Sequence, residues 1–329
     1  MSIKIVILGD GISSQLFMSF LKYHINMDYM CLVIEKKLRK DKQDIDDVPF
    51  YFNRVIDDLK ELFVPIKVQM GIYDKGEIID QVRDDLVDKY AMKTLGHCNN
   101  NTIRFIEKEK KAYVVKDENG NLGRKMMLYS ELKKRNTKNQ YLYDSEVVRI
   151  DNETQTVYTV NNDKINYDFL ISTIPLIDLN KITGQCHWID NCLNTYPFFI
   201  NRFLVKGDGR YQVLYCTDDN VRFSRIAKLN ETIFLESREK IDFDYITLEE
   251  FRFISHVFNL NCAPQKSYIS YPGRFQQIND DFCTRIRREY RKSNIFLLGR
   301  MATWRFKLVE DIYDDCKEIC KWIFQKECI

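Results

Sequence analysis

The residues whose types and spacing suggest chemistry begin at position 9. Gly9 and Gly11 follow an apolar run at residues 3–8, and a helical pattern begins at Gln15. A strand, a glycine turn and a helix in this order can bind a phosphate, because the first glycine permits a tight turn and the second lets the backbone approach the anion at the helix N-terminus. The third small residue is Ser14 instead of glycine, which still permits close packing of the helix on the strand. The segment predicts a site for the pyrophosphate of a dinucleotide.

A carboxylate follows at the distance that such a unit requires. Residues 30–34 form a second apolar run with strand character, and Glu35 comes directly after it. In dinucleotide-binding units an acidic residue at this point accepts hydrogen bonds from a ribose hydroxyl. Its charge also disfavours the 2′-phosphate of NADP. The alternative to a dinucleotide site is an ordinary unit of strand, helix and strand with a glycine turn and a surface glutamate. These residues alone do not decide between the two.

The C-terminal part of the chain has a second strand that ends at a glycine. Residues 294–298 have the composition of a buried strand, Gly299 and Arg300 follow, and residues 309–324 have the periodicity of a helix with one apolar face. This is a second place where backbone amides can meet a phosphate. No other G-x-G-x-x-G sequence opens a further nucleotide unit, which disfavours a pyridine-nucleotide reductase with two nucleotide sites.

The elements between these segments must position them. Periodicity and turn signals predict five elements. They are an amphipathic helix at residues 78–90, a helix within 122–135, a strand at 145–150, a hairpin with strands at 156–160 and 164–166, and an apolar run at 167–176 that enters a proline-marked turn. The charged stretch after Glu35 looks like the start of an insertion into the first unit.

Composition excludes several classes of function. The 329 residues are 45% hydrophobic, which can build a full core, and carry a net charge of +2, which gives no overall field for nucleic acid or an anionic membrane. The basic run at residues 285–292 is interpreted as a solvated helix face. The start lacks the features of a signal peptide and no apolar stretch is long enough for a membrane span, so we expect a cytoplasmic protein.

We expect no protein-bound metal. The ten cysteines include no C-x-x-C pair, and the four histidines show no ligand spacing. Cys316 and Cys320 have helical spacing, and packing in the core is the simplest interpretation because cysteine behaves as a small buried hydrophobe. A regulatory thiol is the alternative.

Three separated segments together resemble the FAD-dependent superfamily of amine oxidases, protoporphyrinogen oxidases and UDP-galactopyranose mutases. They are GDGISS with Glu35, then SEVVRID and YDFLISTIPL, and finally LLGRMATWRFKLVED. The resemblance implies FAD as cofactor, with the backbone of Val148 at its adenine end and Gly299 and Arg300 beside the flavin. Trp304 borders the flavin or packs in the core. The residues that the resemblance places at the cofactor are Gly9, Gly11, Ile12, Ser13, Ser14, Glu35, Lys36, Val148, Thr173, Gly299, Arg300, Trp304, Leu308 and Val309.

Within this superfamily the sequence is most similar to the mutases. Phe223-Ser224-Arg225-Ile226 is similar to their arginine strand, and Ser270-Tyr271-Pro272 to their tyrosine-proline turn. The similarity implies that Arg225, Tyr271 and Arg300 face the substrate, as candidate catalytic residues, since guanidinium groups bind a diphosphate well. The chain departs from the mutases at Lys228, Phe306 and Leu308, and their tryptophan-rich uridine-binding segment is not found.

The resemblance implies an α/β fold: a Rossmann-like FAD-binding domain with a parallel sheet and an inserted α+β substrate domain with a mixed sheet. We expect residues 1–44, 122–180 and 290–329 in the first domain and 45–121 and 181–289 in the second. The predicted function is an FAD-dependent oxidoreductase or mutase-like enzyme acting on a small, anionic substrate such as an amine or nucleotide sugar. The alternative is a non-catalytic FAD-binding protein. Nucleic acid and membranes are not expected as partners.

Overall fold

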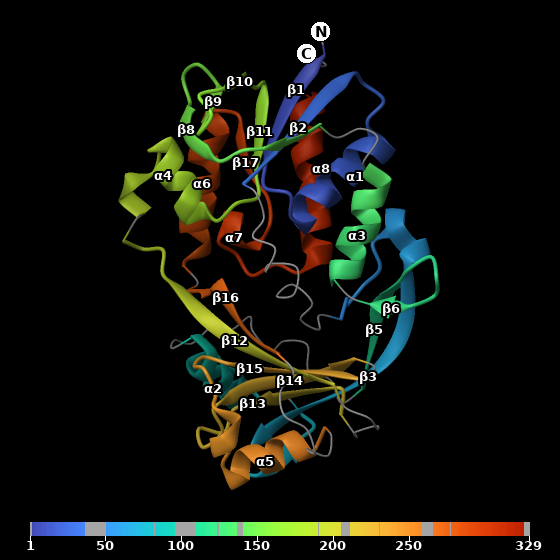
Figure 1. Cartoon of the computed structure of the whole chain (residues 1–329). Helices are drawn as coiled ribbons and strands as arrows, with labels where there is room; N and C mark the ends of the chain where they lie inside the picture. The colour runs from blue at the N-terminus through green and yellow to red at the C-terminus, as the bar shows by residue number, and fades with distance from the viewer. Residues whose placement is uncertain are drawn as a thin grey trace.

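The computed structural model describes residues 2–36, 51–81, 83–95, 109–123, 125–136, 141–189, 191–204, 211–229, 231–257, 266–276 and 278–325. Figure 1 shows two lobes, one above the other, with both chain termini at the top of the upper lobe. The upper lobe contains a parallel sheet with helices around it. The lower lobe contains a large curved sheet with a helix beneath it.

The upper sheet has five parallel strands in the order β17-β11-β1-β2-β7. Their bounds are β1 Ile3–Leu8, β2 Tyr29–Glu35, β7 Tyr141–Asp144, β11 Phe169–Ser172 and β17 Ile295–Leu297. Strand residues alternate between the two faces, and both faces are apolar because both are covered. Ile5 and Ile7 belong to one buried cluster, and Val6 and Leu8 belong to the other.

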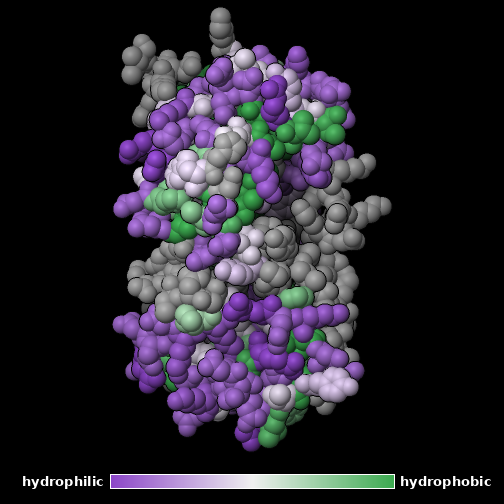
Figure 2. All heavy atoms as spheres, turned by 90° about the vertical axis from the view of Figure 1, so that its left-hand side faces the viewer, coloured by the Kyte–Doolittle hydropathy of each residue, from purple (hydrophilic) through white to green (hydrophobic). Residues whose placement is uncertain are grey.

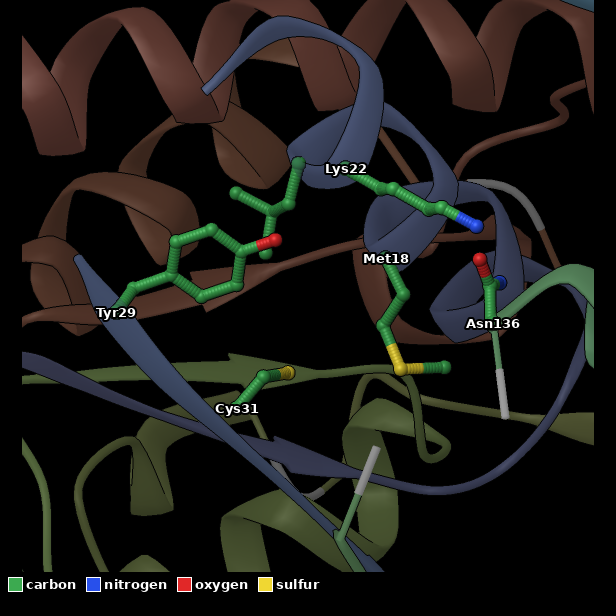
Figure 3. Close-up of a pocket in the computed structure, with 6 residues that line it drawn as sticks. Met18, Lys22, Tyr29, Cys31 and Asn136 are labelled. Atoms are coloured by element: carbon green, nitrogen blue, oxygen red, sulfur yellow. The ribbon is translucent and has the colours of Figure 1, made fainter. Parts of the chain in front are cut away.

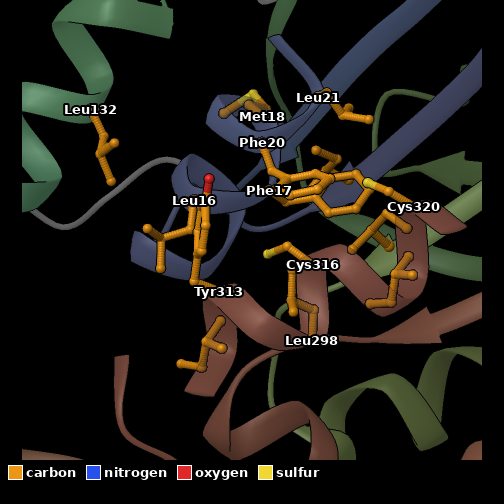
Figure 4. Packing of buried hydrophobic residues seen from close by; sticks show 14 of the residues in the cluster. Leu16, Phe17, Met18, Phe20, Leu21, Leu132, Leu298, Tyr313, Cys316 and Cys320 are labelled. Carbon is orange, nitrogen blue, oxygen red and sulfur yellow. The ribbon is translucent and has the colours of Figure 1, made fainter. Parts of the chain in front are cut away.

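Three helices cover one face of this sheet. They are α1 (Ile12–His24), α3 (Lys125–Asn136) and α8 (Val309–Gln325). In Figure 4, Phe17 and Phe20 of α1 lie against Cys316 and Cys320 of α8. Both thiols are buried, and burial raises the pKa of each. Their packing in the core is confirmed.

The other face carries smaller elements and two further helices. A three-stranded antiparallel sheet lies here, in the order β10-β9-β8, with bounds β8 Val147–Asp151, β9 Thr156–Thr159 and β10 Lys164–Asn166. Helices α4 (Leu176–Thr183) and α6 (Asp280–Lys292) contribute Leu179 and Ile286 to the same buried cluster as Val6. The predicted hairpin at residues 156–166 is confirmed.

The lower sheet has nine strands, in the order β16-β12-β15-β14-β13-β3-β5-β6 with β4 paired to β3. Its strands are β3 Phe63–Asp74, β4 Glu77–Ile79, β5 Glu109–Lys116, β6 Leu122–Gly123, β12 Thr195–Leu204, β13 Val213–Cys216, β14 Phe223–Leu229, β15 Thr232–Ser237 and β16 Lys266–Phe275. Among the strand pairs that the structure describes in this sheet, β13 and β3 run parallel and all others run antiparallel. Helix α5 (Leu248–Ser255) packs on one face and α2 (Asp84–Leu95) on the other.

The remaining short helices are η2 (Asp57–Leu62), η4 (His187–Ile189), η5 (Phe243–Tyr245) and α7 (Arg300–Thr303). Residues of η2 pack in the core beneath the upper sheet, together with Phe52 and α8. The predicted domain boundaries stay a prediction, and segments 52–62 and 280–289, which they assign to the substrate domain, contact the upper lobe.

One predicted element was wrong in its extent. The predicted helix at residues 78–90 begins only at Asp84, because Lys75 and Gly76 have positive φ angles (52° and 81°) and turn the chain into strand β4. The helix predicted within residues 122–135 is confirmed as α3, which begins at Lys125 because Leu122 and Gly123 pair with β5. In the first segment Ile78 and Ile79 pair with β3, although their local periodicity fits a helix.

Figure 2 shows that hydrophilic residues cover most of the described part of one face of the molecule, in both lobes. Within the residues that the structure describes, no helix has the length and apolar character needed to cross a membrane. The same residues contain no group of three or more histidine, cysteine, aspartate or glutamate side chains that could hold a metal ion.

Candidate functional site

The candidate site lies where the parallel strands end and begins with the turn at Gly9. The φ angle of Gly9 is +93°, and a Cβ atom there would lie 2.7 Å from Oγ1 of Thr173. Thr173 follows β11, and its hydroxyl donates to the carbonyl of Leu8 over 2.7 Å. Only glycine fits this position, because a side chain would be strained and would also clash. The turn therefore holds the ends of β1 and β11 close together.

The N-terminus of α1 follows this turn. Gly11 is its N-cap, with no side chain that caps the helix and no acidic residue in the first turn. The first backbone N–H groups of a helix have no partner within the helix, and they carry partial positive charge. A Cβ atom on Gly11 would meet no atom of the described residues within 4 Å, so the space beside Gly11 at the start of the helix is open. Ile12, Ser13 and Ser14 supply the amides of this first turn.

Glu35 ends the neighbouring strand β2 and reaches this turn. Its Oε2 accepts a hydrogen bond from the backbone N–H of Asp10 over 2.6 Å. Lys36 forms an exposed ion pair with Glu146, and the backbone N–H of Ser145 donates to the carbonyl of Glu35. The structure thus brings Glu35, Lys36 and the residues before β8 to one place.

Val148 lies in β8, at an irregularity in its pairing with β9. Its side chain is 51% exposed, which is unusual for a valine in a strand. Val148 comes three residues after Ser145, whose backbone N–H donates to Glu35. The predicted contact of the Val148 backbone with a cofactor stays a prediction.

Asp10 is a site residue that the sequence did not reveal. It is 5% exposed, and its carboxylate accepts hydrogen bonds from Gln15 over 2.5 Å, from Tyr129 over 3.1 Å and from Lys133 over 2.8 Å. Burial alone lowers the pKa of Lys133, but its hydrogen bonds to Asp10 and Tyr129 raise the pKa above its ordinary value. These contacts fix the glycine turn to α3.

A small cavity lies beside these contacts, between α1, α3 and β2. Figure 3 shows Met18, Lys22, Tyr29, Cys31 and Asn136 around it. Its volume of about 10 Å³ is enough for roughly one water molecule. The cavity is therefore too small for a substrate or cofactor.

The C-terminal segment meets the first segment at Gly299, directly after β17. Gly299 has a φ angle of +98°, and a Cβ atom there would lie 2.5 Å from Oγ of Ser13 in α1. The backbone N–H of Leu298 donates to the carbonyl of Ser172, which holds β17 beside β11. Residues 9–14, 173 and 299 are therefore neighbours, although up to 290 positions separate them in the chain.

Arg300 begins the short helix α7 and lies between two aromatic rings. Its guanidinium carbon is 5.2 Å from the ring centroid of Phe275 and 4.8 Å from that of Phe306. A guanidinium group at such distances is attracted to the ring faces. Phe306 is one of the departures from the mutase pattern, and here it contacts the arginine.

The structure corrects the expectation that the indole of Trp304 borders the cofactor. Trp304 is 0% exposed, its Nε1–H donates to the carbonyl of Gln276 over 2.9 Å, and its ring lies 5.0 Å from that of Phe275. The indole packs in the core, which was the alternative expectation. A fully buried ring offers no surface to a ligand in this conformation.

Leu308 and Val309 lie at the start of α8, where carboxylates are close. The backbone N–H of Leu308 donates to Oδ2 of Asp311 over 2.9 Å. Glu310 is 3% exposed and accepts from the backbone N–H of Asn53 over 2.6 Å. Burial raises the pKa of Glu310. Contacts of Leu308 and Val309 with a cofactor stay predictions.

The candidate catalytic residues are not brought together by any described contact. Arg225 lies in β14, is 9% exposed and forms an ion pair with Glu236 in β15. Burial alone lowers the pKa of Arg225, but the charge of Glu236 raises it above its ordinary value. Tyr271 lies in β16 between the paired residues Ser270 and Arg274, and its side chain is outside the described part of the structure.

No protein-family profile and no curated protein sequence matches this chain. Solved structures do match its fold. A reduced UDP-galactopyranose mutase superposes with a TM-score of 0.71 and 11% identity, covering 98% of this chain and 96% of the mutase. A fatty acid isomerase from P. acnes that produces CLA has a TM-score of 0.59 and 11% identity, with 97% and 98% of the chains covered.

A flavin-dependent halogenase from Xanthomonas campestris also matches, with a TM-score of 0.54 and 10% identity, covering 99% of this chain and 71% of the halogenase. At such low identity these similarities establish the fold. The chain therefore has the α/β fold that the sequence predicted, with a Rossmann-like parallel sheet and a second, mixed sheet.

Proposed function

We propose that the chain binds FAD along the ends of the parallel strands. The observation that carries this proposal is the meeting of Gly9, Ser13, Thr173 and Gly299 beside an uncapped helix N-terminus. The open space at Gly11 suits the close approach of a pyrophosphate, whose charge the first amides of α1 would stabilise. The shared fold with a flavin-dependent halogenase and with a UDP-galactopyranose mutase supports the same cofactor.

The residues of the chain have distinct roles in this proposal. Glu35 accepts hydrogen bonds from a ribose hydroxyl while it holds the N–H of Asp10. Asp10 and Lys133 keep the turn in place and do not contact the dinucleotide. Arg300, held between two phenylalanine rings, presents a cation beside the flavin. When bound, FAD supplies the redox or nucleophilic chemistry, and the protein orients the reactants and excludes water.

We further propose that the protein is a flavin-dependent enzyme with a small anionic substrate. The substrate would lie between the flavin and the lower sheet, within reach of Arg300. Two reactions fit this arrangement: oxidation of a C–H bond next to an amine or alcohol, and a redox-neutral isomerisation of a nucleotide sugar. The shared fold with two isomerising enzymes, a mutase and a fatty acid isomerase, favours an isomerisation, and the mutase among them suggests a nucleotide sugar.

A second candidate function is a protein that binds FAD without turnover. Two observations favour it: Arg225 is already paired with Glu236, and the closing loop has Phe306 and Leu308 where the mutases carry polar residues. Such a protein would use the dinucleotide as a structural element or a sensor.

An absorption spectrum of the purified protein from 300 to 550 nm, repeated after denaturation, tests the cofactor. Flavin bands that shift on denaturation support the proposal, and a protein that stays colourless even after incubation with FAD contradicts it. Dithionite reduction followed by a screen of amines and nucleotide sugars then separates an enzyme from a binding protein. Product formation supports the enzyme, whereas a reducible flavin with no turnover on either class supports the second candidate.

A further inference from the structure

Arg202 lies near the end of β12, on the face of the sheet opposite to α5. Its neighbours Asn201 and Phe203 are 2% and 0% exposed, and Phe203 packs in the cluster that includes Phe253 of α5. Successive side chains of a strand point to opposite faces, so Arg202 points away from α5. Figure 1 shows that α5 lies on the side of the sheet that is remote from the parallel-sheet lobe.

The pairing of the strands confirms this placement. Arg202 is opposite Phe234 of β15, and Phe234 is opposite Ala227 of β14. Ala227 packs in the cluster of α2, on the other face from α5. Arg225 and Glu236 are opposite each other, two residues from Ala227 and Phe234. Arg202 and the Arg225–Glu236 ion pair therefore share one face.

Arg202, Arg225 and Glu236 together carry two positive charges and one negative charge. The only carboxylate among these three residues belongs to Glu236, and Arg225 holds it in a buried ion pair. Glu236 is two residues along β15 from Phe234, the residue opposite Arg202, and such diagonal neighbours on adjacent strands are within reach of long side chains. The Nε atom of Arg202 is buried and has no hydrogen-bond partner among the residues that the structure describes. A buried N–H group without a partner in a native protein calls for an explanation, such as a bound ion or ligand.

We propose that Arg202 binds an oxyanion of the substrate, a phosphoryl or carboxylate group. The proposal rests on the proposed function, because it places the substrate between the flavin and this face of the sheet. The sequence predicted Arg225 as a residue that faces the substrate, but Glu236 already neutralises the charge of Arg225. The proposal therefore assigns this role to Arg202. A guanidinium group suits this role because its fixed donors match the oxygens of phosphate and carboxylate groups.

The test uses the FAD-loaded protein and three probes: inorganic pyrophosphate, inorganic phosphate and malonate. Binding is measured by calorimetry, and by the rise in thermal midpoint that a ligand selective for the folded state causes. We expect at least one probe to bind, and Arg202→Gln to weaken that binding at least tenfold. Arg202→Lys, which keeps the charge and loses the planar fork, should weaken it less.

The matched control is Arg238→Gln, which removes the same charge from an exposed arginine directly after β15. It should bind the probe like the wild type. The inference is overturned if none of the probes binds the wild type, or if Arg202→Gln and Arg238→Gln bind it equally well. The circular dichroism spectrum of Arg202→Gln checks that the lower sheet stays folded, and the Arg202→Lys variant tests the same site with the charge retained. The flavin spectrum of each variant separates a failure of this inference from a failure to bind FAD.

Discussion

Substituting Gly11 by alanine separates the role of this residue in the fold from its role toward a ligand. The backbone of Gly11 has ordinary angles (φ −84°, ψ −177°), and the added Cβ atom meets no atom of the described residues within 4 Å. Removing a glycine lowers the entropy of the unfolded chain, which contributes about 0.4–1 kcal/mol to stability. Alanine is a poorer N-cap than glycine and costs a similar amount. The free energy of unfolding without cofactor should therefore change by less than about 1 kcal/mol.

Binding of FAD should respond much more strongly. The methyl group of Gly11→Ala would occupy the open space beside Gly11 at the start of α1 and keep the pyrophosphate from the α1 amides. Losing one hydrogen bond to a charged group costs about 1.5–3 kcal/mol. Because 1.4 kcal/mol corresponds to a factor of ten, the Kd for FAD should rise about 10- to 100-fold.

Gly9→Ala is the contrasting variant. Its positive φ angle costs about 1–3 kcal/mol in any other residue, and the contact with Thr173 Oγ1 at 2.7 Å adds to this cost. Urea unfolding without FAD and a fluorescence titration with FAD are measured for both variants. The reasoning is refuted if Gly11→Ala binds FAD as tightly as the wild type, or if it loses as much stability as Gly9→Ala.

Three further substitutions test other parts of the site. Phe306→Ala should weaken FAD binding in the same titration by roughly 2- to 30-fold, because a cation–π contact with Arg300 is worth about 0.5–2 kcal/mol, and Phe306→Tyr should not. Lys133→Met should lower the free energy of urea unfolding by about 1–2 kcal/mol, because Asp10 loses its counter-charge, whereas Lys133→Arg should retain most of it. For Glu310, burial raises the pKa, so the folded state binds its proton more tightly than the unfolded state, and stability is lost as the pH rises above the ordinary value of 4.5. Glu310→Gln should therefore be more stable than the wild type at pH 7, by on the order of 1 kcal/mol, and the advantage should shrink toward pH 4. An unchanged difference between these two pH values would contradict this assignment.

The first unit could be predicted because its signals are local. The run at residues 3–8, the glycine turn and the strand before Glu35 lie within about thirty residues, and each has a pattern that only one arrangement explains well. The structure confirms β1, α1 and β2 in this order. Gly299 was recognised by its place after a strand, and its contact with Ser13 follows from the parallel order of β17, β11 and β1.

The contacts that were missed depend on elements far apart in the chain. Asp10 and Lys133 are 123 residues apart, and nothing in either segment indicates that α3 packs beside the glycine turn. The ion pair of Arg225 depends on the register between β14 and β15, which a sequence pattern does not specify without the turn geometry. Trp304 could border a ligand or pack in the core, and only the position of Phe275 decides between them.

The most direct test of the central claim is a pair of titrations of the cofactor-free protein, one with FAD and one with riboflavin, followed by flavin fluorescence. Riboflavin contains the isoalloxazine ring and lacks the pyrophosphate and the adenosine. If the amides of α1 and the carboxylate of Glu35 hold the dinucleotide, FAD should bind at least 100-fold more tightly, since about 2.8 kcal/mol is less than two charged hydrogen bonds contribute. Equal affinities, or no binding of FAD, would contradict the account.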